Sequence, residues 1–144
     1  MSPHRVENPK MSVFYSYTCP ECGFRQEASS DGHGYIACDK DERHYFYHPC
    51  EMLQIEEAAR KFKECRGKSY SEIMEIALSR IGYEDDAICL DCAYSYRADR
   101  KSSSPPCPKC KSGNSTWLTE LVGKRCPKCR SGTFPLGGKF EGVS

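Results

Sequence analysis

The chain has 144 residues, of which 28% are charged and 38% hydrophobic, and its formal net charge at neutral pH is +1. This length predicts one domain or two small ones, and the polar composition without a long apolar run argues against a membrane protein. Because the sequence also shows no secretion leader and no lipidation motif, we expect a cytoplasmic protein.

The cysteines are the main chemical feature of the sequence. There are eleven, and a chain expected in the reducing cytosol uses cysteines more often as metal ligands than in disulfides. A Cys-x-x-Cys turn points two sulfurs at one metal, and two such turns complete a tetrahedral zinc site. The spacing therefore predicts two or three zinc ions. The four pairs are Cys19/Cys22, Cys89/Cys92, Cys107/Cys110 and Cys126/Cys129, which leaves Cys38, Cys50 and Cys65 as single residues.

Charge is unevenly distributed along the chain. Residues 1–92 carry 11 Lys and Arg against 17 Asp and Glu, whereas residues 93–144 carry 10 against 3. A zinc ion with four thiolates carries a net charge of −2, so the metal sites offset part of the basic C-terminal charge.

The N-terminal part reads as a short extension followed by a β unit. Residues 1–11 lack apolar periodicity and are expected to be mobile. Residues 12–50 are expected to form a zinc-knuckle β unit, because aromatic and β-branched runs lead into and out of the first cysteine pair. Gly23 follows that pair and allows the left-handed backbone of a knuckle. The expected strands are 13–18, 24–28, 35–38 and 44–48.

Residues 51–83 change to a helical period. Apolar residues recur at helical spacing over 51–66 and again over 69–81, and glycines at 67 and 82 are expected to end the two helices. Ser69 and Glu72 have the spacing of a capping box. The short link between the two segments predicts an antiparallel helical hairpin.

Residues 84–136 contain the three remaining cysteine pairs. The expected strands in this part are 94–97, 115–122 with Trp117, and 130–136, and residues 137–144 are expected to be a frayed tail.

The motifs Cys-Pro-Glu-Cys-Gly at Cys19 and Cys-Pro-Lys-Cys at Cys107 and Cys126 resemble the knuckles of rubredoxin-type zinc ribbons. The resemblance covers residues 87–134 and Cys19–Cys22. It implies zinc binding but no particular function, because such ribbons occur in transcription factors, polymerase subunits and ribosomal proteins alike. The expected fold class is a small zinc-stabilised α+β protein with zinc-ribbon β-hairpins and a two-helix insert.

The sequence leaves the grouping of the cysteines open. The arrangement ranked first joins Cys19 and Cys22 to His48 and Cys50, with Cys38 as a substitute, and leaves Cys126/Cys129 as half a site. A nested arrangement joins the first pair to the last, and Cys89/Cys92 to Cys107/Cys110. A sequential arrangement joins Cys19/Cys22 to Cys89/Cys92, and Cys107/Cys110 to Cys126/Cys129.

No enzyme is expected, because His44 and His48 lack the glutamate and the helix of a zinc hydrolase motif. The main hypothesis is an adaptor that docks on a larger protein or nucleoprotein complex. Nucleic-acid binding through the basic C-terminal part is the alternative, and a thiol redox switch or chaperone is a more remote one. No membrane or small-molecule partner is expected. The candidate partner-binding residues are Tyr45, Phe46, Trp117, Lys124 and Arg125.

Overall fold

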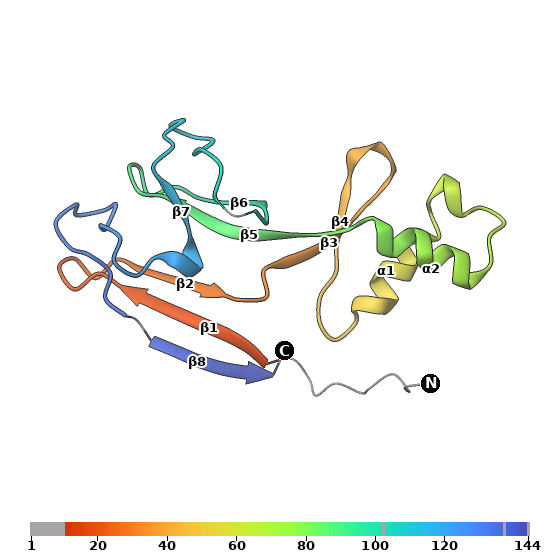
Figure 1. Ribbon diagram of the computed structural model, residues 1–144, viewed down its shortest axis with the longest axis horizontal. Coiled ribbons are helices and arrows are strands. Elements are labelled where there is room, and N and C mark those ends of the chain that lie inside the picture. Colours follow the sequence, from red (N-terminus) through yellow and green to blue (C-terminus); the bar gives the residue numbers. More distant parts are fainter. Residues whose placement is uncertain (1–10, 102, 137, 144) are drawn as a thin grey trace. The chain divides into compact units, whose positions relative to one another are not determined.

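The computed structural model describes residues 11–101, 103–136 and 138–143 (Figure 1). It is a mixed structure with antiparallel sheets and two α-helices among the described residues. Backbone contacts divide the chain into two compact units. Unit 1 consists of the described residues within 1–31, 86–96 and 103–144, and unit 2 consists of those within 32–85 and 97–102.

Unit 1 contains a three-stranded antiparallel sheet in the order β2-β1-β8 (Figure 1). Its strands are β1 (Met11–Thr18), β2 (Arg25–Ser29) and β8 (Gly138–Val143). Thr18 pairs with Arg25, so the first cysteine pair lies in the turn between β1 and β2. Met11 pairs with Val143, which places the two ends of the described chain on neighbouring strands.

The remainder of unit 1 carries the other cysteine pairs. It includes the ends of β5 (Ile81–Cys89) and β6 (Ser95–Asp99) next to the second pair, the short strand β7 (Ser115–Trp117) and a 3-10 turn at Leu118–Glu120. β7 pairs antiparallel with β5. The core of unit 1 combines apolar residues with two of the paired cysteines, namely Tyr17, Cys19, Ile88, Leu118, Leu121, Cys126 and Phe134.

Unit 2 packs two helices with a small sheet. In this unit β3 (His33–Ala37) pairs antiparallel with both β4 (Arg43–Tyr45) and β5, and helix α1 (Glu51–Ala59) packs with α2 (Tyr70–Ser79). Two 3-10 turns, Asp39–Asp41 and Lys63–Cys65, complete the unit. Its buried core is Ile36, Phe46, Ile55, Ala58, Ala59, Phe62, Cys65, Ile73, Met74 and Ala77.

The structure confirms the predicted capping box of α2, and α1 is shorter than predicted. The Ser69 hydroxyl accepts from the Glu72 backbone N–H, and the Glu72 carboxylate accepts from the Ser69 backbone N–H. The helix expected over 51–66 ends at Ala59, because Phe62 turns extended to bury its ring, which is 1% exposed. The Arg80 guanidinium covers that ring at 4.1 Å.

A polar network around the buried Glu84 crosses the sheet of unit 2. Glu84 on β5 is only 7% exposed and pairs with Arg43 on β4. The Tyr45 hydroxyl donates to Glu84 Oε1 at 2.9 Å, and Arg43 also pairs with Asp99 on β6 at 2.7 Å. The Arg43 guanidinium lies 4.0 Å above the Tyr35 ring. Glu84 is therefore buried with partners for its charge.

Several strands differ from the sequence predictions. The strand expected over 115–122 is limited to Ser115–Trp117, and the strand expected over 130–136 is reduced to one isolated bridge, between Arg125 and Thr133. Gly82 was expected to end a helix but lies in β5 opposite Tyr35, where a Cβ atom would collide with the tyrosine hydroxyl. The tail expected to fray over 137–144 instead contains β8, which pairs with β1; residues 137 and 144 lie outside the described residues.

The compact units also cut across the expected domain boundaries. Residues 12–50 were expected to form one β unit, but contacts assign Asp31 to unit 1 and Gly32 to unit 2. The mobile extension expected over 1–11 falls outside the described residues except for Met11, which begins β1. Within the described part of the chain, neither helix has the length and apolar character needed to cross a membrane.

Candidate metal centres

Each cysteine pair lies in a turn with the same backbone hydrogen bonds. The N–H of the first cysteine donates to a carbonyl five or six residues later, and the N–H that follows the second cysteine donates back to the carbonyl of the first, at 2.8–3.0 Å. All four turns are therefore knuckles of one type. We number them knuckle 1 (Cys19–Gly23), knuckle 2 (Cys89–Ala93), knuckle 3 (Cys107–Lys111) and knuckle 4 (Cys126–Arg130).

The residue after the second cysteine is left-handed in every knuckle. Its φ is 80° at Gly23, 67° at Ala93 and Lys111, and 62° at Arg130. Glycine adopts this conformation freely, whereas any other residue costs about 1–2 kcal/mol there. The sequence signalled the conformation only at Gly23, so three knuckles adopt it without glycine.

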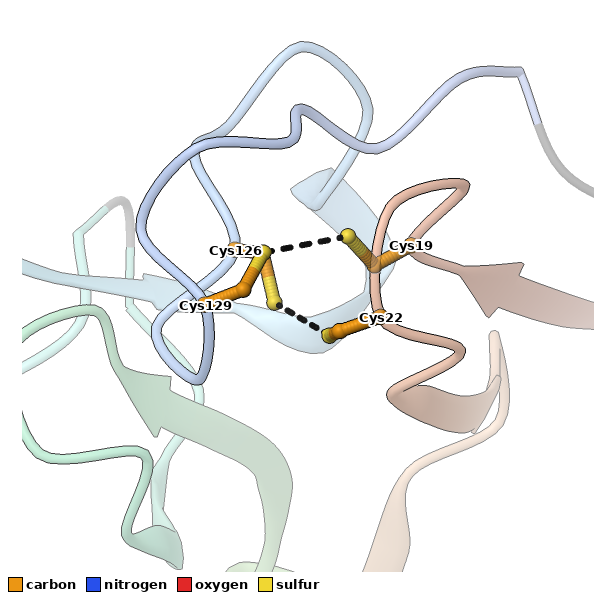
Figure 2. A group of neighbouring side chains, drawn as sticks. All are labelled: Cys19, Cys22, Cys126 and Cys129. Atoms are coloured by element: carbon orange, nitrogen blue, oxygen red, sulfur yellow. Dashed lines mark hydrogen bonds between the residues drawn. The ribbon is translucent and has the colours of Figure 1, made fainter.

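Knuckles 1 and 4 form the first four-cysteine group, which we call site 1. Its four sulfurs lie within 4.8 Å of one another. Figure 2 shows the side chains converging from the two turns, with Cys19 Sγ 3.6 Å from Cys129 Sγ and Cys22 Sγ 3.7 Å from Cys126 Sγ. Cys19 and Cys126 are buried and Cys22 is exposed.

Knuckles 2 and 3 form site 2 in the same way. The four sulfurs of Cys89, Cys92, Cys107 and Cys110 also lie within 4.8 Å of one another. Cys89 Sγ is 3.5 Å from Cys110 Sγ, and Cys92 Sγ is 3.7 Å from Cys107 Sγ.

The sulfur distances match a tetrahedral metal site. Four sulfurs at about 2.3 Å from a central zinc lie about 3.8 Å from one another, whereas a disulfide requires about 2.05 Å. The 3.5–3.7 Å separations in the two groups are close to the first value and far from the second. The residues therefore fit a bound metal ion at each site.

The structure corrects the ligand set that the sequence ranked first. Cys19 and Cys22 meet Cys126 and Cys129, as in the nested arrangement, and neither His48 nor Cys50 belongs to either group. His48 and Cys50 are both in unit 2, where His48 Nδ1 lies 3.2 Å from a Glu51 carboxylate oxygen. Two knuckles already supply the four sulfurs of a tetrahedral site, so no histidine is needed.

The remaining single cysteines are not part of either site. Cys38 Sγ donates to the Ile36 carbonyl at 3.6 Å, and burial raises the pKa of its thiol. Cys65 is buried in the core of unit 2, and burial raises its pKa as well. Both thiols therefore favour their neutral form and behave as small apolar side chains.

The knuckle backbones stabilise negative charge on sulfur. In site 1, backbone N–H groups of Gly132 and Ser131 lower the pKa of Cys129 to about 6. In site 2, burial raises the pKa of Cys107, but hydrogen bonds from the Cys110 and Lys109 N–H groups outweigh it and bring the pKa to about 7. Each site thus contains a thiol that ionises near neutral pH, the form in which cysteine binds metals.

Two other thiols, Cys22 and Cys110, have raised pKa values. The pKa of Cys22 rises to about 11: the Phe24 backbone N–H lowers it, but partial loss of hydration and hydrogen bonds with neighbouring cysteines outweigh this. The Ser112 N–H lowers the pKa of Cys110, but hydrogen bonds with neighbouring cysteines and partial loss of hydration outweigh it and bring the pKa to about 12. A metal ion that binds near neutral pH must therefore displace protons from these thiols.

The predicted partner-binding aromatics are largely internal. Phe46 is 8% exposed and belongs to the core of unit 2, and Trp117 is 6% exposed in unit 1. Tyr45 is half-buried and occupied with Glu84. Phe46 and Trp117 are thus core residues. For Phe46 the sequence signal is the alternation of side chains in the strand expected over 44–48, which turns Phe46 away from its neighbours Tyr45 and Tyr47. Lys124 and Arg125 are exposed, as expected.

Several of the C-terminal basic side chains have local partners. Lys109 Nζ lies 5.8 Å from the Tyr94 ring centroid, and Lys128 Nζ lies 5.7 Å from that of Phe24. Lys111 Nζ donates to the Pro108 carbonyl at 3.0 Å. Their charge is therefore partly used within the knuckles.

A further set of polar contacts surrounds knuckle 2, and no sequence motif indicates it. The Asp91 carboxylate accepts hydrogen bonds from the Ser112 hydroxyl and from Asn114 Nδ2, the latter at 2.9 Å. These two residues follow knuckle 3, so Asp91 ties together the two knuckles of site 2. These hydrogen bonds lower the pKa of the Asp91 carboxyl group.

The described architecture and its two sites define a mixed α/β protein with two four-cysteine groups compatible with metal binding. Comparisons of the chain with protein-family models, with curated proteins and with solved structures found no match.

Proposed function

We propose that the protein binds two zinc ions, one at each four-cysteine site, and that these ions are structural. The observation that carries this proposal is the closed composition of both sites, each made of four cysteines from two knuckles. Structural zinc sites use four protein ligands, whereas catalytic ones keep a position open for water or substrate. We therefore propose a non-enzymatic protein.

Native mass spectrometry of the full chain, purified without chelator, tests the metal content. We expect two zinc ions per chain, with one lost in Cys19→Ser or Cys126→Ser and the other retained. If those two variants lost different ions, the grouping into site 1 would be wrong. A protein without zinc would contradict the proposal.

We further propose that the protein acts by docking on a larger protein, and that unit 2 provides the contact surface. Tyr47, Met52 and Leu53 are 54%, 55% and 70% exposed around the start of α1. Hydrogen bonds fix this segment: the Tyr47 N–H donates to Gln54 Oε1 at 2.6 Å, and the Cys50 N–H donates to the Tyr47 carbonyl at 2.9 Å. Exposed apolar side chains on an ordered segment lose little entropy on binding.

A crosslinking experiment in cells that express the tagged full chain tests this docking proposal. Leu53→Asp is expected to abolish a specific crosslinked complex that wild-type protein forms. The matched control is Leu136→Asp in unit 1, because Leu136 is also an exposed apolar residue, at 85%. If both variants lost the crosslinked complex equally, or if both retained it, a docking surface at α1 would be contradicted.

Nucleic-acid binding remains a second candidate, favoured by Lys124 and Arg125, which make no ion pair among the described residues, and by Tyr94, which is 42% exposed beside Lys109. Aromatic and basic side chains together bind single strands. A labelled single-stranded oligonucleotide should then bind with an affinity that falls steeply with salt and on Lys124→Glu with Arg125→Glu. Docking through α1 should not respond to these changes.

A further inference from the structure

Arg130 connects the two sites. It is the last residue of knuckle 4, which belongs to site 1, and its backbone N–H donates to the Cys126 carbonyl at 3.0 Å. Its guanidinium donates to the backbone carbonyl of Asp91, inside knuckle 2 of site 2. We propose that Arg130 couples the two metal sites, so that an ion bound at one strengthens binding at the other. This inference rests on the proposed zinc binding.

The coupling passes through a single peptide group. The Asp91 carbonyl and the Cys92 N–H belong to the same peptide, and that N–H donates to Cys89 Sγ at 3.4 Å. A cationic donor on the carbonyl polarises the peptide and strengthens the hydrogen bond on its other side. The Arg130 charge therefore acts through Asp91 on the sulfur of a site 2 ligand.

Packing around the same peptide supports this connection. Leu90, the residue before Asp91, packs against the core cluster that contains Phe134 and two site 1 cysteines, Cys19 and Cys126. On its other side, the Asp91 carboxylate is held by Ser112 and Asn114. The peptide is thus fixed between the two sites, and a shift of knuckle 4 is transmitted to it.

The coupling has a defined size and is reciprocal. An intramolecular hydrogen bond contributes about 1 kcal/mol net, which corresponds to about a fivefold change in affinity. By linkage, an ion at site 1 that fixes Arg130 raises the affinity of site 2 by the same factor as the reverse. Arg130 is a positioning residue in this scheme, since it contacts no metal ligand sulfur directly in the described contacts.

The test variant is Arg130→Ala, with Lys111→Ala as its matched control. Knuckle 2 already has alanine at the equivalent left-handed position, Ala93, so the backbone of knuckle 4 should accept it. Lys111 holds that position in knuckle 3, and its Nζ donates within its own knuckle, to Pro108. The two variants thus place alanine at equivalent positions, but only Arg130→Ala removes a contact between the two sites.

The measurement is thiol protection at each site in full-length protein. Free zinc is set with chelator buffers, a short pulse of N-ethylmaleimide modifies unprotected thiols, and peptide mass spectrometry identifies them. In Arg130→Ala, protection of the site 2 cysteines should require about fivefold more free zinc. Arg130→Lys should restore part of the loss, and Lys111→Ala should leave protection of site 1 unchanged.

Other outcomes separate the possible failures. Unchanged site 2 protection in Arg130→Ala would overturn the coupling while leaving zinc binding intact. Lys111→Ala could also raise the free zinc needed to protect site 1 by as much as Arg130→Ala raises it for site 2. That result would mean that either substitution loosens the knuckles generally, which also overturns the coupling. In a Cys129→Ser background, where site 1 is incomplete, Arg130→Ala should have little further effect on site 2, and a full effect there would contradict the proposal. No protection at either site in wild-type protein would overturn the zinc proposal itself.

Discussion

Unit 1 and unit 2 use cysteine in opposite ways. In unit 1, two of the seven residues in the buried cluster are knuckle cysteines, so the sulfurs that face a metal also form part of the core. In unit 2, the cluster has ten buried residues, and its one fully buried cysteine, Cys65, acts as an apolar side chain. Unit 1 therefore depends on its sites, whereas unit 2 has a conventional core with two helices.

The local turn, and not burial, decides the role of a cysteine in this protein. The eight cysteines of the two sites lie in knuckles whose backbone N–H groups point at sulfur, as the Asp91 and Lys109 N–H groups do at 3.4 Å. Cys65 lies in a 3-10 turn beside Phe62, where burial favours the neutral thiol. Such a division predicts that the two units respond separately to metal removal and to core substitutions.

Metal removal should have the largest effect and should act on unit 1. Structural zinc contributes an apparent binding free energy of about 10–16 kcal/mol, which is comparable to the whole stability of a domain. Trp117 is the only tryptophan of the chain and is buried in unit 1, and both described helices belong to unit 2. On addition of a strong chelator, tryptophan emission should shift to the red while the helical circular dichroism signal is retained.

Loss of both signals together would instead show that the two units unfold as one. Re-addition of zinc is the control for reversibility, and it should restore the tryptophan emission.

The converse change is Phe62→Ala in unit 2. Phe62 is 1% exposed and sandwiched between the core and Arg80, and such a truncation costs about 3–5 kcal/mol. The helical signal should melt at a lower temperature, while native mass spectrometry still counts two zinc ions. Leu53→Ala, at a residue that is 70% exposed, is the control and should change the melting temperature little. Reduced zinc content in Phe62→Ala would contradict the separation.

The parts of the molecule that the sequence predicts well are those set by neighbouring residues. The α2 capping box, the strands on both sides of knuckle 1 and the eight knuckle cysteines all follow from local spacing. The grouping of the knuckles does not, because Cys22 and Cys126 are 104 residues apart and four equivalent turns carry no sign of which two meet.

Other differences also arise from contacts between distant segments. The sequence of β8 contains two glycines and no clear alternation, so its pairing with β1 depends on that strand's free edge. Gly82 is consistent with a helix end when read alone, and its role in β5 becomes visible only when Tyr35 lies against it. The contact between Arg130 and Asp91 likewise joins residues separated by 39 positions.

A smaller effect is expected from the polar network of unit 2. Glu84→Gln keeps the shape but removes the charge that Arg43 faces, and an impaired buried partner costs about 1–3 kcal/mol. Urea unfolding followed by the helical signal should show this loss. The comparison in unit 1 is Glu27→Gln, which disrupts the ion pair between Glu27 and Arg25. The side chains of Arg25 and Glu27 are 59% and 70% exposed, so this change should alter the free energy of unfolding by less than about 0.5 kcal/mol. Equal effects would show that burial does not distinguish the two pairs.

A local effect of modest size is predicted at the start of α2. Ser69→Ala removes the oxygen that accepts the Glu72 N–H at 3.3 Å, and loss of such a cap costs about 1 kcal/mol, measured by urea unfolding of the helical signal. Ser71→Ala, two residues later, is the control.

The contribution of Glu72 to stability should depend on pH, because hydrogen bonds from Ser69 lower the pKa of its carboxyl group below the ordinary 4.5. A group with a lowered folded pKa stabilises above its unfolded pKa, and the stabilisation disappears as the pH falls through the folded pKa. The difference in stability between wild type and Glu72→Gln should therefore be full above pH 4.5 and shrink in acid. A difference that stays constant down to the lowest pH would show that the Glu72 carboxylate does not act through its charge.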